Sequence, residues 1–513
     1  MNSFFKSTVA LTTSLCLAGG ALAAPVASAF QAAPKTTQST PSVLDLNLPS
    51  LGTTADSSLS PSQERALGAN LMTKVRTDPT YVSDPVLSEY LNKLGYKLVS
   101  SAKTYTYQFF FFAIRDATLN AFALPGGYIA IHTGTIIAAR NESELAGVLG
   151  HEIGHVSQRH IARMIESQRS NLPITIGSIL LAILVARAGG NSGGHAAAAI
   201  AMGSQAAMIQ SMLNYSQDAE READRIGLQT LYNAGFNPEG MQGFFERLQA
   251  KNRLYESAAP AYLSTHPLTL DRLSDMEART KQLPHQAHQD SLDFSLVQVR
   301  ARVIQQNTHD GWLKEKAELE RQLKDAKGQK ALVLHYGLSV VNSFLNLPEE
   351  AYREAEFTRA LGPNPIVAQN LSLTRFQAAK SASEKEAALA QAKADLSRYP
   401  LSSMMTENYV DLLYRLDRHE TLIKFLENNL PQDSSSDFHA MLARSYEKLG
   451  KRSEQYRHTG EMYALLGDPE AAEYQYALAQ KAADADFYTM SVIDARLREL
   501  RAQVIELKKE KNR

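Results

Sequence analysis

"LGHEIGHVSQRH", residues 149–160, places three histidines and one glutamate within twelve positions. His151 and His155 are four residues apart, so on a helix both imidazoles lie on one face and can reach one metal ion. Glu152 is rotated by about 100° from His151 and can instead reach a water molecule at that ion. The H-E-x-x-H spacing predicts a zinc site on a helix. For the motif alone, a solvated helix rich in histidine is the alternative.

A third ligand must come from elsewhere in the chain, and "AEREADR", residues 219–225, supplies a candidate. Glu220 and Asp224 are also four apart, so Glu220 can bind the ion while Asp224 accepts the ring N–H of a ligand histidine. Two neutral imidazoles and one carboxylate leave a zinc ion with net positive charge, which brings the pKa of a bound water toward neutrality. Alone, this stretch also fits a salt-bridged helix surface. Its pairing with the H-E-x-x-H motif favours the metal site.

Length and composition exclude some classes of protein. The chain has 513 residues, 44% of them hydrophobic and 21% charged, which is typical of a globular protein with at least two domains. Lys plus Arg (53) nearly balances Asp plus Glu (54). This balance argues against a nucleic-acid partner.

The first 29 residues have the pattern of a secretory signal peptide: one lysine, an apolar run, then small residues. The pattern A-x-A ends at Ala23 and again at Ala29, so we expect cleavage after one of these two. Cys16, the one cysteine in the sequence, lies within this segment. We therefore predict a periplasmic protein without disulfides. Residues 30–59, which are rich in Ser, Thr, Pro and Ala, predict a disordered linker between the signal peptide and the first folded domain.

Residues 60–285 predict an α+β domain that is mainly helical. Ser60-Pro61 and Asp84-Pro85 each pair a capping side chain with proline, which predicts two helix starts. The β-rich stretches "TYQFFFFAI" and "GYIAIHTG" predict a small sheet with a hairpin turn at Pro125-Gly126-Gly127. Asn141 and Glu144 resemble a capping box that opens the helix of the H-E-x-x-H motif.

The second β-rich stretch also suggests a substrate site. We predict that Tyr128, Ile129, Ala130 and Ile131 form an edge strand, to which an extended substrate adds through main-chain hydrogen bonds. A buried central strand is an equally compatible interpretation of the same residues.

Residues 172–188 are apolar but only about 17 long, at the lower limit for a membrane span. We expect no stable transmembrane helix there. With the Gly- and Met-rich segment that follows, these residues instead suggest a lid or a surface that meets apolar polypeptide. A membrane-embedded peptidase is kept as a minor hypothesis.

Residues 290–513 predict an all-helical repeat domain. Two "LG" turns, at 449–450 and 466–467, are 17 residues apart, which is half of a 34-residue tetratricopeptide period. Residues 332–365 form another complete unit. We predict a tetratricopeptide solenoid that holds a partner or substrate, capped by a charged helix at the end of the sequence.

His160 follows His155 by five positions, which places it about 140° away around a continuous helix. We therefore interpret His160 as outside the ligand set, and Arg159 and Arg163 as solvated.

Four motifs in one order, over residues 60–280, resemble the HtpX-like family of zinc metallopeptidases. They are "NAFALPGGYIAIHTG", H-E-x-x-H, E-x-x-x-D and "STHPLTLDRL". The resemblance implies His151, His155 and Glu220 as zinc ligands, with Glu152 as general base and acid. With the signal peptide and repeats, it also implies work on outer-membrane β-barrel proteins that stall during assembly. The implied partners are the β-barrel assembly machinery and the lipopolysaccharide-transport barrel.

His266 lies in the last of these motifs, before Pro267, which favours an extended backbone. It can act as a fourth ligand that restrains the resting enzyme, or as a donor that stabilises an oxyanion. A surface histidine in a turn is the plainer interpretation.

Two functions from different classes stay open on these observations. One is a periplasmic zinc endopeptidase that degrades misassembled barrel proteins and assists their assembly. The other is an assembly chaperone or scaffold, in which the repeats act and the zinc site is structural or vestigial.

Overall fold

The computed structural model describes residues 59–102, 108–167, 217–254, 261–429 and 436–511. The described residues belong to one compact unit, Ser50–Arg513. The predicted signal peptide, nearly all of the linker, the apolar segment 172–188 and the Gly- and Met-rich segment after it lie outside the described residues. Within the described ranges, no helix has both the length and the hydropathy needed to cross a membrane.

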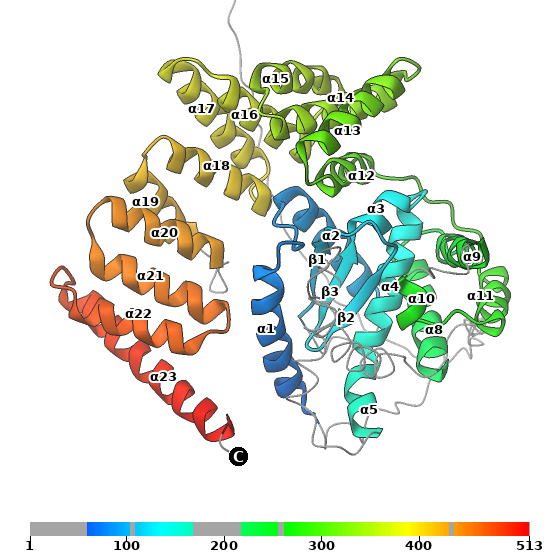
Figure 1. The fold of residues 1–513 in the computed structure, drawn as a ribbon, viewed down its shortest axis with the longest axis horizontal. Coiled ribbons are helices and arrows are strands. Elements are labelled where there is room, and N and C mark those ends of the chain that lie inside the picture. Colours follow the sequence, from blue (N-terminus) through cyan, green and yellow to red (C-terminus); the bar gives the residue numbers. More distant parts are fainter. Residues whose placement is uncertain (1–58, 103–107, 168–216, 255–260, 430–435, 512–513) are drawn as a thin grey trace, which may run out of the picture. The chain divides into compact units, whose positions relative to one another are not determined.

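Two capped helices open the described chain, as the sequence predicts (Figure 1). Helix α1 (Pro61–Thr77) begins after Ser60, whose side chain forms a complete capping box with Gln63. Helix α2 (Pro85–Val99) begins after Asp84, whose carboxylate accepts the Leu87 N–H at 3.0 Å. The apolar face of α2 packs against the first strand, which fixes one side of the sheet.

The sheet has three strands in the order β1-β3-β2. Strand β1 (Phe110–Ile114) runs parallel to β3 (Tyr128–His132), while β2 (Ala121–Leu124) runs antiparallel to it. The prediction that Tyr128–Ile131 form an edge strand is therefore wrong, because β3 has a neighbour on both sides. Its apolar residues are buried since they lie at the centre of the sheet.

The predicted hairpin turn is confirmed, but its first strand differs from the expected one. The turn joins β2 to β3, and Gly126 and Gly127 adopt φ values of 81° and 94°, a region that favours glycine. Residues of "TYQFFFFAI" instead form β1 and pair in parallel with β3. The short β2 was not distinguished from its turn in the sequence.

Helix α4 (Glu142–Ser157) carries the H-E-x-x-H motif and is buried along almost its whole length. It follows the short helix α3 (Thr133–Ala138) and packs against β2, α8 and α9. Asn141 caps it by accepting the Glu144 N–H at 2.9 Å. The Glu144 carboxylate accepts from the Arg140 N–H and pairs with Arg247, so only half of the predicted capping box forms.

Five described helices complete the region around α4. Helix α5 (His160–Ser167) follows it directly, and α8 (Gln217–Asn233) ends before Gly235, whose φ is 83°. This end confirms the predicted stop of the "AEREADR" helix. The others are α9 (Glu239–Leu254), α10 (Ala261–Thr265) and α11 (Leu270–Gln282).

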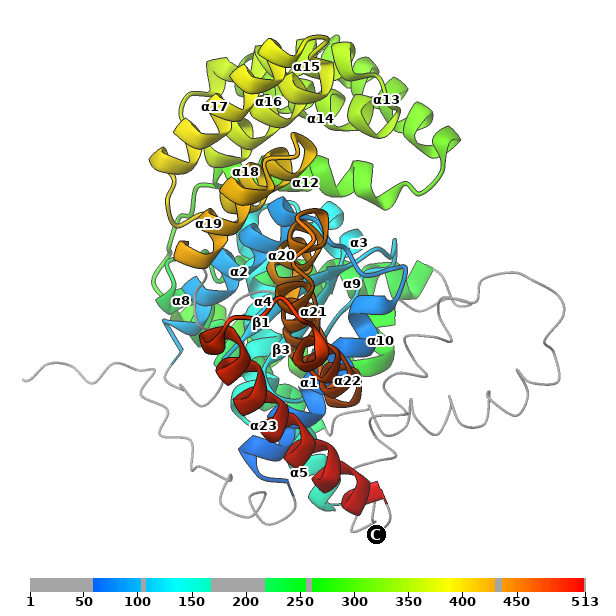
Figure 2. The same cartoon turned by 90° about the vertical axis from the view of Figure 1, so that its left-hand side faces the viewer.

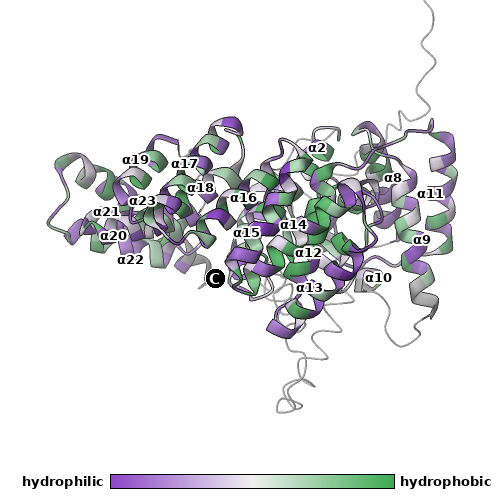
Figure 3. Cartoon of the chain, turned by 90° about the horizontal axis from the view of Figure 1, so that it is seen from above, coloured by the Kyte–Doolittle hydropathy of each residue, from purple (hydrophilic) through white to green (hydrophobic). Residues whose placement is uncertain are grey.

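The rest of the described chain is helical, as expected, and consecutive helices pack against one another (Figure 2). Gly450 and Gly467, with φ values of 71° and 78°, terminate two of these helices at the predicted "LG" turns. Hydrophilic and hydrophobic residues alternate along the helices, as expected where one face is buried (Figure 3). The helices are α12 (Leu292–Gln305), α13 (His309–Leu323), α14 (Gly328–Phe344), α15 (Pro348–Phe357), η3 (Thr358–Leu361), α16 (Pro365–Ala378), α17 (Ala382–Arg398), α18 (Ser403–Arg415), α19 (His419–Asn429), α20 (Ser436–Lys448), α21 (Arg452–Leu465), α22 (Pro469–Lys481) and α23 (Phe487–Lys511).

Helix α12 connects the helices that follow it to the sheet region. It packs against α2, α3 and α14. Its buried Arg300 binds both carboxylate oxygens of Asp84, the cap of α2, at 2.7–3.0 Å, and donates to the Tyr336 hydroxyl of α14 at 3.1 Å. A boundary near residue 290 would cut these contacts, so α12 belongs as much to the first region as to the helices that follow it.

Candidate metal centre

Two helices in close contact present the predicted ligands. The backbones of α4 and α8 approach closely because glycines lie between them: a Cβ on Gly227 would lie 2.8 Å from the backbone nitrogen of His151. A Cβ on Gly154 would lie 2.9 Å from the carbonyl oxygen of Ala223. This approach brings Glu220 of α8 to the histidine face of α4. Substituting either glycine would push the two ligand-bearing helices apart.

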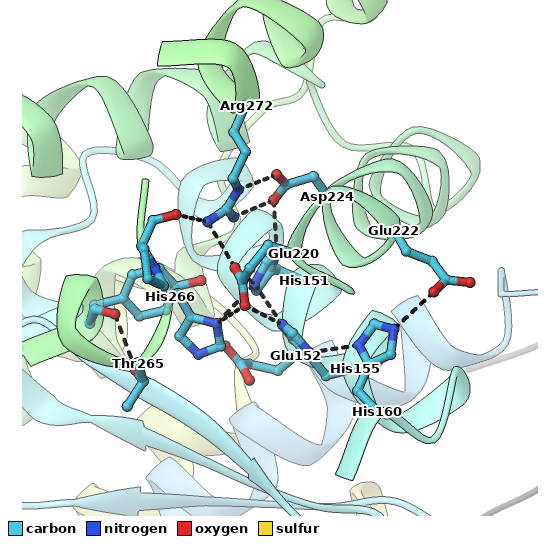
Figure 4. A network of polar contacts seen from close by, with 12 residues as sticks. His151, Glu152, His155, His160, Glu220, Glu222, Asp224, Thr265, His266 and Arg272 are labelled. Atoms are coloured by element: carbon cyan, nitrogen blue, oxygen red, sulfur yellow. Dashed lines mark hydrogen bonds and ion pairs between the residues drawn. The ribbon is translucent and has the colours of Figure 1, made fainter. Parts of the chain in front are cut away.

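Four side chains converge on one point (Figure 4). His151 Nε2 lies 3.0 Å from His155 Nε2 and 3.5 Å from Glu220 Oε2, and His155 Nε2 lies 3.4 Å from Glu220 Oε1. His266 Nδ1 lies 3.3 Å from His151 Nε2 and 3.0 Å from Glu220 Oε1. Ligands about 2.0–2.2 Å from a tetrahedral zinc ion lie roughly 3.3–3.5 Å apart. The donor set fits such an ion, and all four side chains are at most 1% exposed.

His266 directly follows α10, and its side chain points into the centre. Its backbone N–H donates to the Tyr262 carbonyl at 2.8 Å, and its ring stacks on the Tyr262 ring at 4.6 Å. Tyr262 in turn donates its backbone N–H to Leu119 beside the sheet. His266 is therefore a buried residue held by local packing, and the interpretation as a surface histidine in a turn is wrong.

His151 is held from behind by a carboxylate, as predicted. Its Nδ1 lies 3.0 Å from Asp224 Oδ1, which turns Nε2 toward the centre. Arg272 of α11 binds Asp224 through Nε at 2.7 Å and Nη2 at 2.8 Å, and its Nη1 lies 2.8 Å from Glu220 Oε2. The fully buried Arg272 was not predicted, although it lies six residues after His266 in "STHPLTLDRL".

Burial and neighbouring groups set the charge of each side chain. Burial raises the pKa of Glu152, and the nearby His266 and His151 imidazoles only partly offset this effect. Burial acts in the same direction on Glu220, but the adjacent imidazoles, His266 first, hold its pKa well below the usual range. Burial lowers the pKa of His151, but hydrogen bonds to Asp224 and Glu220 outweigh it and raise the pKa to about 9. Glu220 is thus ionised, while the protonated and ionised forms of Glu152 are closer in free energy than they are in water.

Glu152 differs from the other carboxylates of the site. Both of its oxygens are buried and make no hydrogen bond to any described residue. The nearest charged partner is His266 Nε2, 3.5 Å from Oε1. A buried carboxylate without a hydrogen-bond partner costs stability, so its presence beside a metal-binding group indicates a functional role.

Two predictions about the end of the H-E-x-x-H helix are wrong. Arg159 is not solvated: its Nε pairs with Glu64 at 3.1 Å, and its side chain is 10% exposed. Arg163 pairs with Glu222 at 2.8 Å and is partly buried. His160 is not among the four converging side chains, as predicted, but it is buried and contacts one of them.

The sequence is similar to those of known metallopeptidases, which agrees with a metal-binding site at this position. Residues 85–280 match the model of Peptidase family M48. A β-barrel assembly-enhancing protease of Escherichia coli strain K12 is 32% identical over 463 residues, which cover 88% of this chain and 91% of that protein. A Vibrio cholerae protein that bears the same name provisionally is 34% identical over 463 residues, 89% of this chain and 93% of that protein. The mitochondrial metalloendopeptidase OMA1 of Arabidopsis thaliana is 32% identical over 154 residues, which cover 30% of this chain and 28% of that protein.

A buried His-His-Glu-His group that can bind a metal, beside a glutamate without a hydrogen-bond partner in the described chain, defines a metalloprotease. The chain belongs to peptidase family M48, and over most of its length it is similar to proteases named for β-barrel assembly.

Proposed function

We propose that this protein is a periplasmic zinc endopeptidase that cleaves outer-membrane β-barrel proteins when their assembly fails, and that assists their assembly. The main support is the pairing of a four-donor group with Glu152, whose buried carboxylate has no hydrogen-bond partner among the described residues. The donor set of imidazoles and one carboxylate suits zinc better than magnesium or calcium, which prefer oxygen ligands. The proposed ligands are His151, His155 and Glu220.

When bound, zinc polarises a peptide carbonyl and makes water acidic enough to attack it near neutral pH. In the proposed reaction, Glu152 accepts a proton from the attacking water and passes it to the leaving amine. Its raised pKa suits both transfers, because the protonated and ionised forms are closer in free energy than in water. Asp224 keeps His151 in the tautomer that presents Nε2 to the ion.

The proposed substrate class comes from the relatives and from the chain's own organisation. The names of the relatives connect those proteins with β-barrel assembly. The helical region after α12 offers surfaces for partners, which we propose are the β-barrel assembly machinery and the lipopolysaccharide-transport barrel. An extended substrate can pair with an outer strand, and of the two outer strands β2 packs against α4.

The substrate class can be tested with one barrel protein in two states. We expect the purified chain to cleave an outer-membrane β-barrel protein that is held unfolded in dilute urea. The same barrel folded in detergent micelles should stay intact, because its strands are already paired and cannot enter a buried site. Cleavage is measured by gel electrophoresis of both samples. Equal cleavage of the unfolded and folded barrel would contradict the proposal.

The alternative of a structural zinc site has one observation in its favour, since four donors converge where a catalytic site needs three and an open position. We propose that His266 is instead a reversible fourth ligand that restrains the resting enzyme. A structural site has no use for a buried carboxylate without a hydrogen-bond partner, such as that of Glu152.

Replacing His266 with alanine separates these roles. We expect His266→Ala to keep zinc through three ligands and to hydrolyse unfolded protein, and itself, faster than the parent. His285→Ala is the matched control, because that imidazole is 71% exposed. Loss of zinc would show a structural ligand, and normal zinc with hydrolysis slowed roughly a hundredfold would show an oxyanion donor. Either result would contradict the proposal that His266 restrains the resting enzyme.

A further inference from the structure

His160 lies against His155 because the chain changes direction between them. Helix α4 ends at Ser157, and Arg159 adopts a φ of 53°, in the left-handed region that breaks a helix. Arg159 is fixed there by its ion pair with Glu64. Helix α5 then starts at His160, and the His155 and His160 rings meet edge to face with centroids 4.8 Å apart. The contact is thus built by the turn and is absent from a continuous helix.

The ring nitrogens have a definite arrangement (Figure 4). His155 turns Nε2 toward the other donors of the centre, 3.0 Å from His151 Nε2. Its Nδ1 faces outward, 2.8 Å from His160 Nδ1. On its far side, His160 Nε2 lies 3.1 Å from Glu222 Oε2, and Arg163 Nη1 donates to the same oxygen at 2.8 Å.

These contacts allow one direction of hydrogen bonding when His155 binds a metal. A ligand Nε2 must be unprotonated, so the proton of His155 resides on Nδ1 and is donated to His160. His160 Nδ1 is then an acceptor, and its proton resides on Nε2, which donates to the Glu222 carboxylate. Arg163 balances the charge of that carboxylate.

The two ligand histidines are therefore supported in different ways. Behind His151 stands the carboxylate of Asp224, which is paired with Arg272. His155 Nδ1 instead contacts the neutral imidazole of His160. The carboxylate of Glu222 and the guanidinium of Arg163 lie on the far side of His160. Helix α8 supplies both outer carboxylates, at positions 222 and 224, two and four residues after the proposed ligand Glu220.

We propose that His160 is a positioning residue for the metal centre: with Glu222, it fixes the tautomer and ring orientation of His155. The inference rests on the proposed role of His155 as a zinc ligand. Hydrogen-bond partners behind a ligand histidine typically contribute 10- to 100-fold to metal affinity. We expect a loss of about that size when His160 can no longer accept a hydrogen bond.

The experiment measures the affinity of the chelator-stripped full chain for Zn²⁺ alone, by competition with a zinc-binding dye. His160→Phe keeps the ring volume but removes both nitrogens, so zinc should bind roughly 10- to 100-fold more weakly. His160→Asn places an amide oxygen near the position of Nδ1 and should recover most of the loss. Glu222→Gln should weaken binding less than His160→Phe, and it provides a variant with a minimal change of shape.

The control is His419→Phe, which removes another buried histidine, one that contacts the Ser445 hydroxyl of α20. It should lower the melting temperature of the metal-free chain without changing zinc affinity. Parental zinc affinity in His160→Phe would overturn the inference while leaving the proposed function intact. An Asn variant as weak as the Phe variant would also overturn it, since the hydrogen bond would then not be the cause. A parent chain that binds no zinc would refute the proposed function, and with it the role of His160.

Discussion

Replacing Glu152 with glutamine is expected to leave zinc bound and to reduce peptide hydrolysis at least about a hundredfold, since general acid–base catalysis typically contributes 10²- to 10⁴-fold. The side chain keeps its size but can no longer accept the proton of the attacking water. Both oxygens of Glu152 are without hydrogen-bond partners in the described chain, so no ligand contact is lost. Hydrolysis of an unfolded substrate and zinc content should be measured on the same preparation.

The melting temperature of Glu152→Gln gives an independent check. Removing a buried carboxylate that has no hydrogen-bond partner relieves a desolvation cost, so the variant should melt no lower than the parent. Glu239→Gln serves as the matched control, because that carboxylate is largely exposed. Hydrolysis at the parental rate by a zinc-loaded Glu152→Gln would show that another group moves the proton.

Replacing Glu220 with alanine is expected to remove the zinc ion, and hydrolysis should be lost because the ion is absent. Glu152→Gln, in contrast, should lose hydrolysis while zinc stays bound. Glu220 approaches both helical histidines, with oxygens 3.4–3.5 Å from their Nε2 atoms, and supplies the negative charge of the donor set. Its loss should weaken zinc binding by more than the roughly 10- to 100-fold expected for an outer hydrogen-bond partner.

The neighbour Arg221 offers a matched control for Glu220. Its pairing with the exposed Asp218 is on the outer surface of the same helix, so Arg221→Ala should keep zinc and activity. A Glu220→Ala chain that still binds one zinc ion with parental affinity would exclude Glu220 as a ligand.

The residues that the sequence places correctly are those related by helix geometry. His151 and His155, and likewise Glu220 and Asp224, are four apart, and each pair lies on one continuous helix. Helix starts at Ser60 and Asp84 were predictable for the same reason, because a cap acts on residues next to it.

The residues that the sequence misses depend on changes of direction or on distant partners. Rotation by 100° per residue moves His160 away from His155, but the left-handed Arg159 brings it back. The ion pair of Arg272 with Asp224 joins positions 48 apart and has no local pattern. Nor does the local alternation of β3 reveal that β1 pairs with it in parallel, which turns the expected edge strand into a central one.

Anomalous X-ray diffraction at the zinc absorption edge, from crystals of the chain purified without added metal, locates the ion directly. We expect one zinc ion per chain, within about 2.0–2.2 Å of His151 Nε2, His155 Nε2 and a carboxylate oxygen of Glu220, with His266 Nδ1 as the fourth ligand of the resting enzyme and with Glu152 beside the ion and not bound to it. An absence of zinc at this point, or a zinc ion bound elsewhere in the chain while hydrolysis proceeds, would contradict the assignment of this site as the catalytic centre.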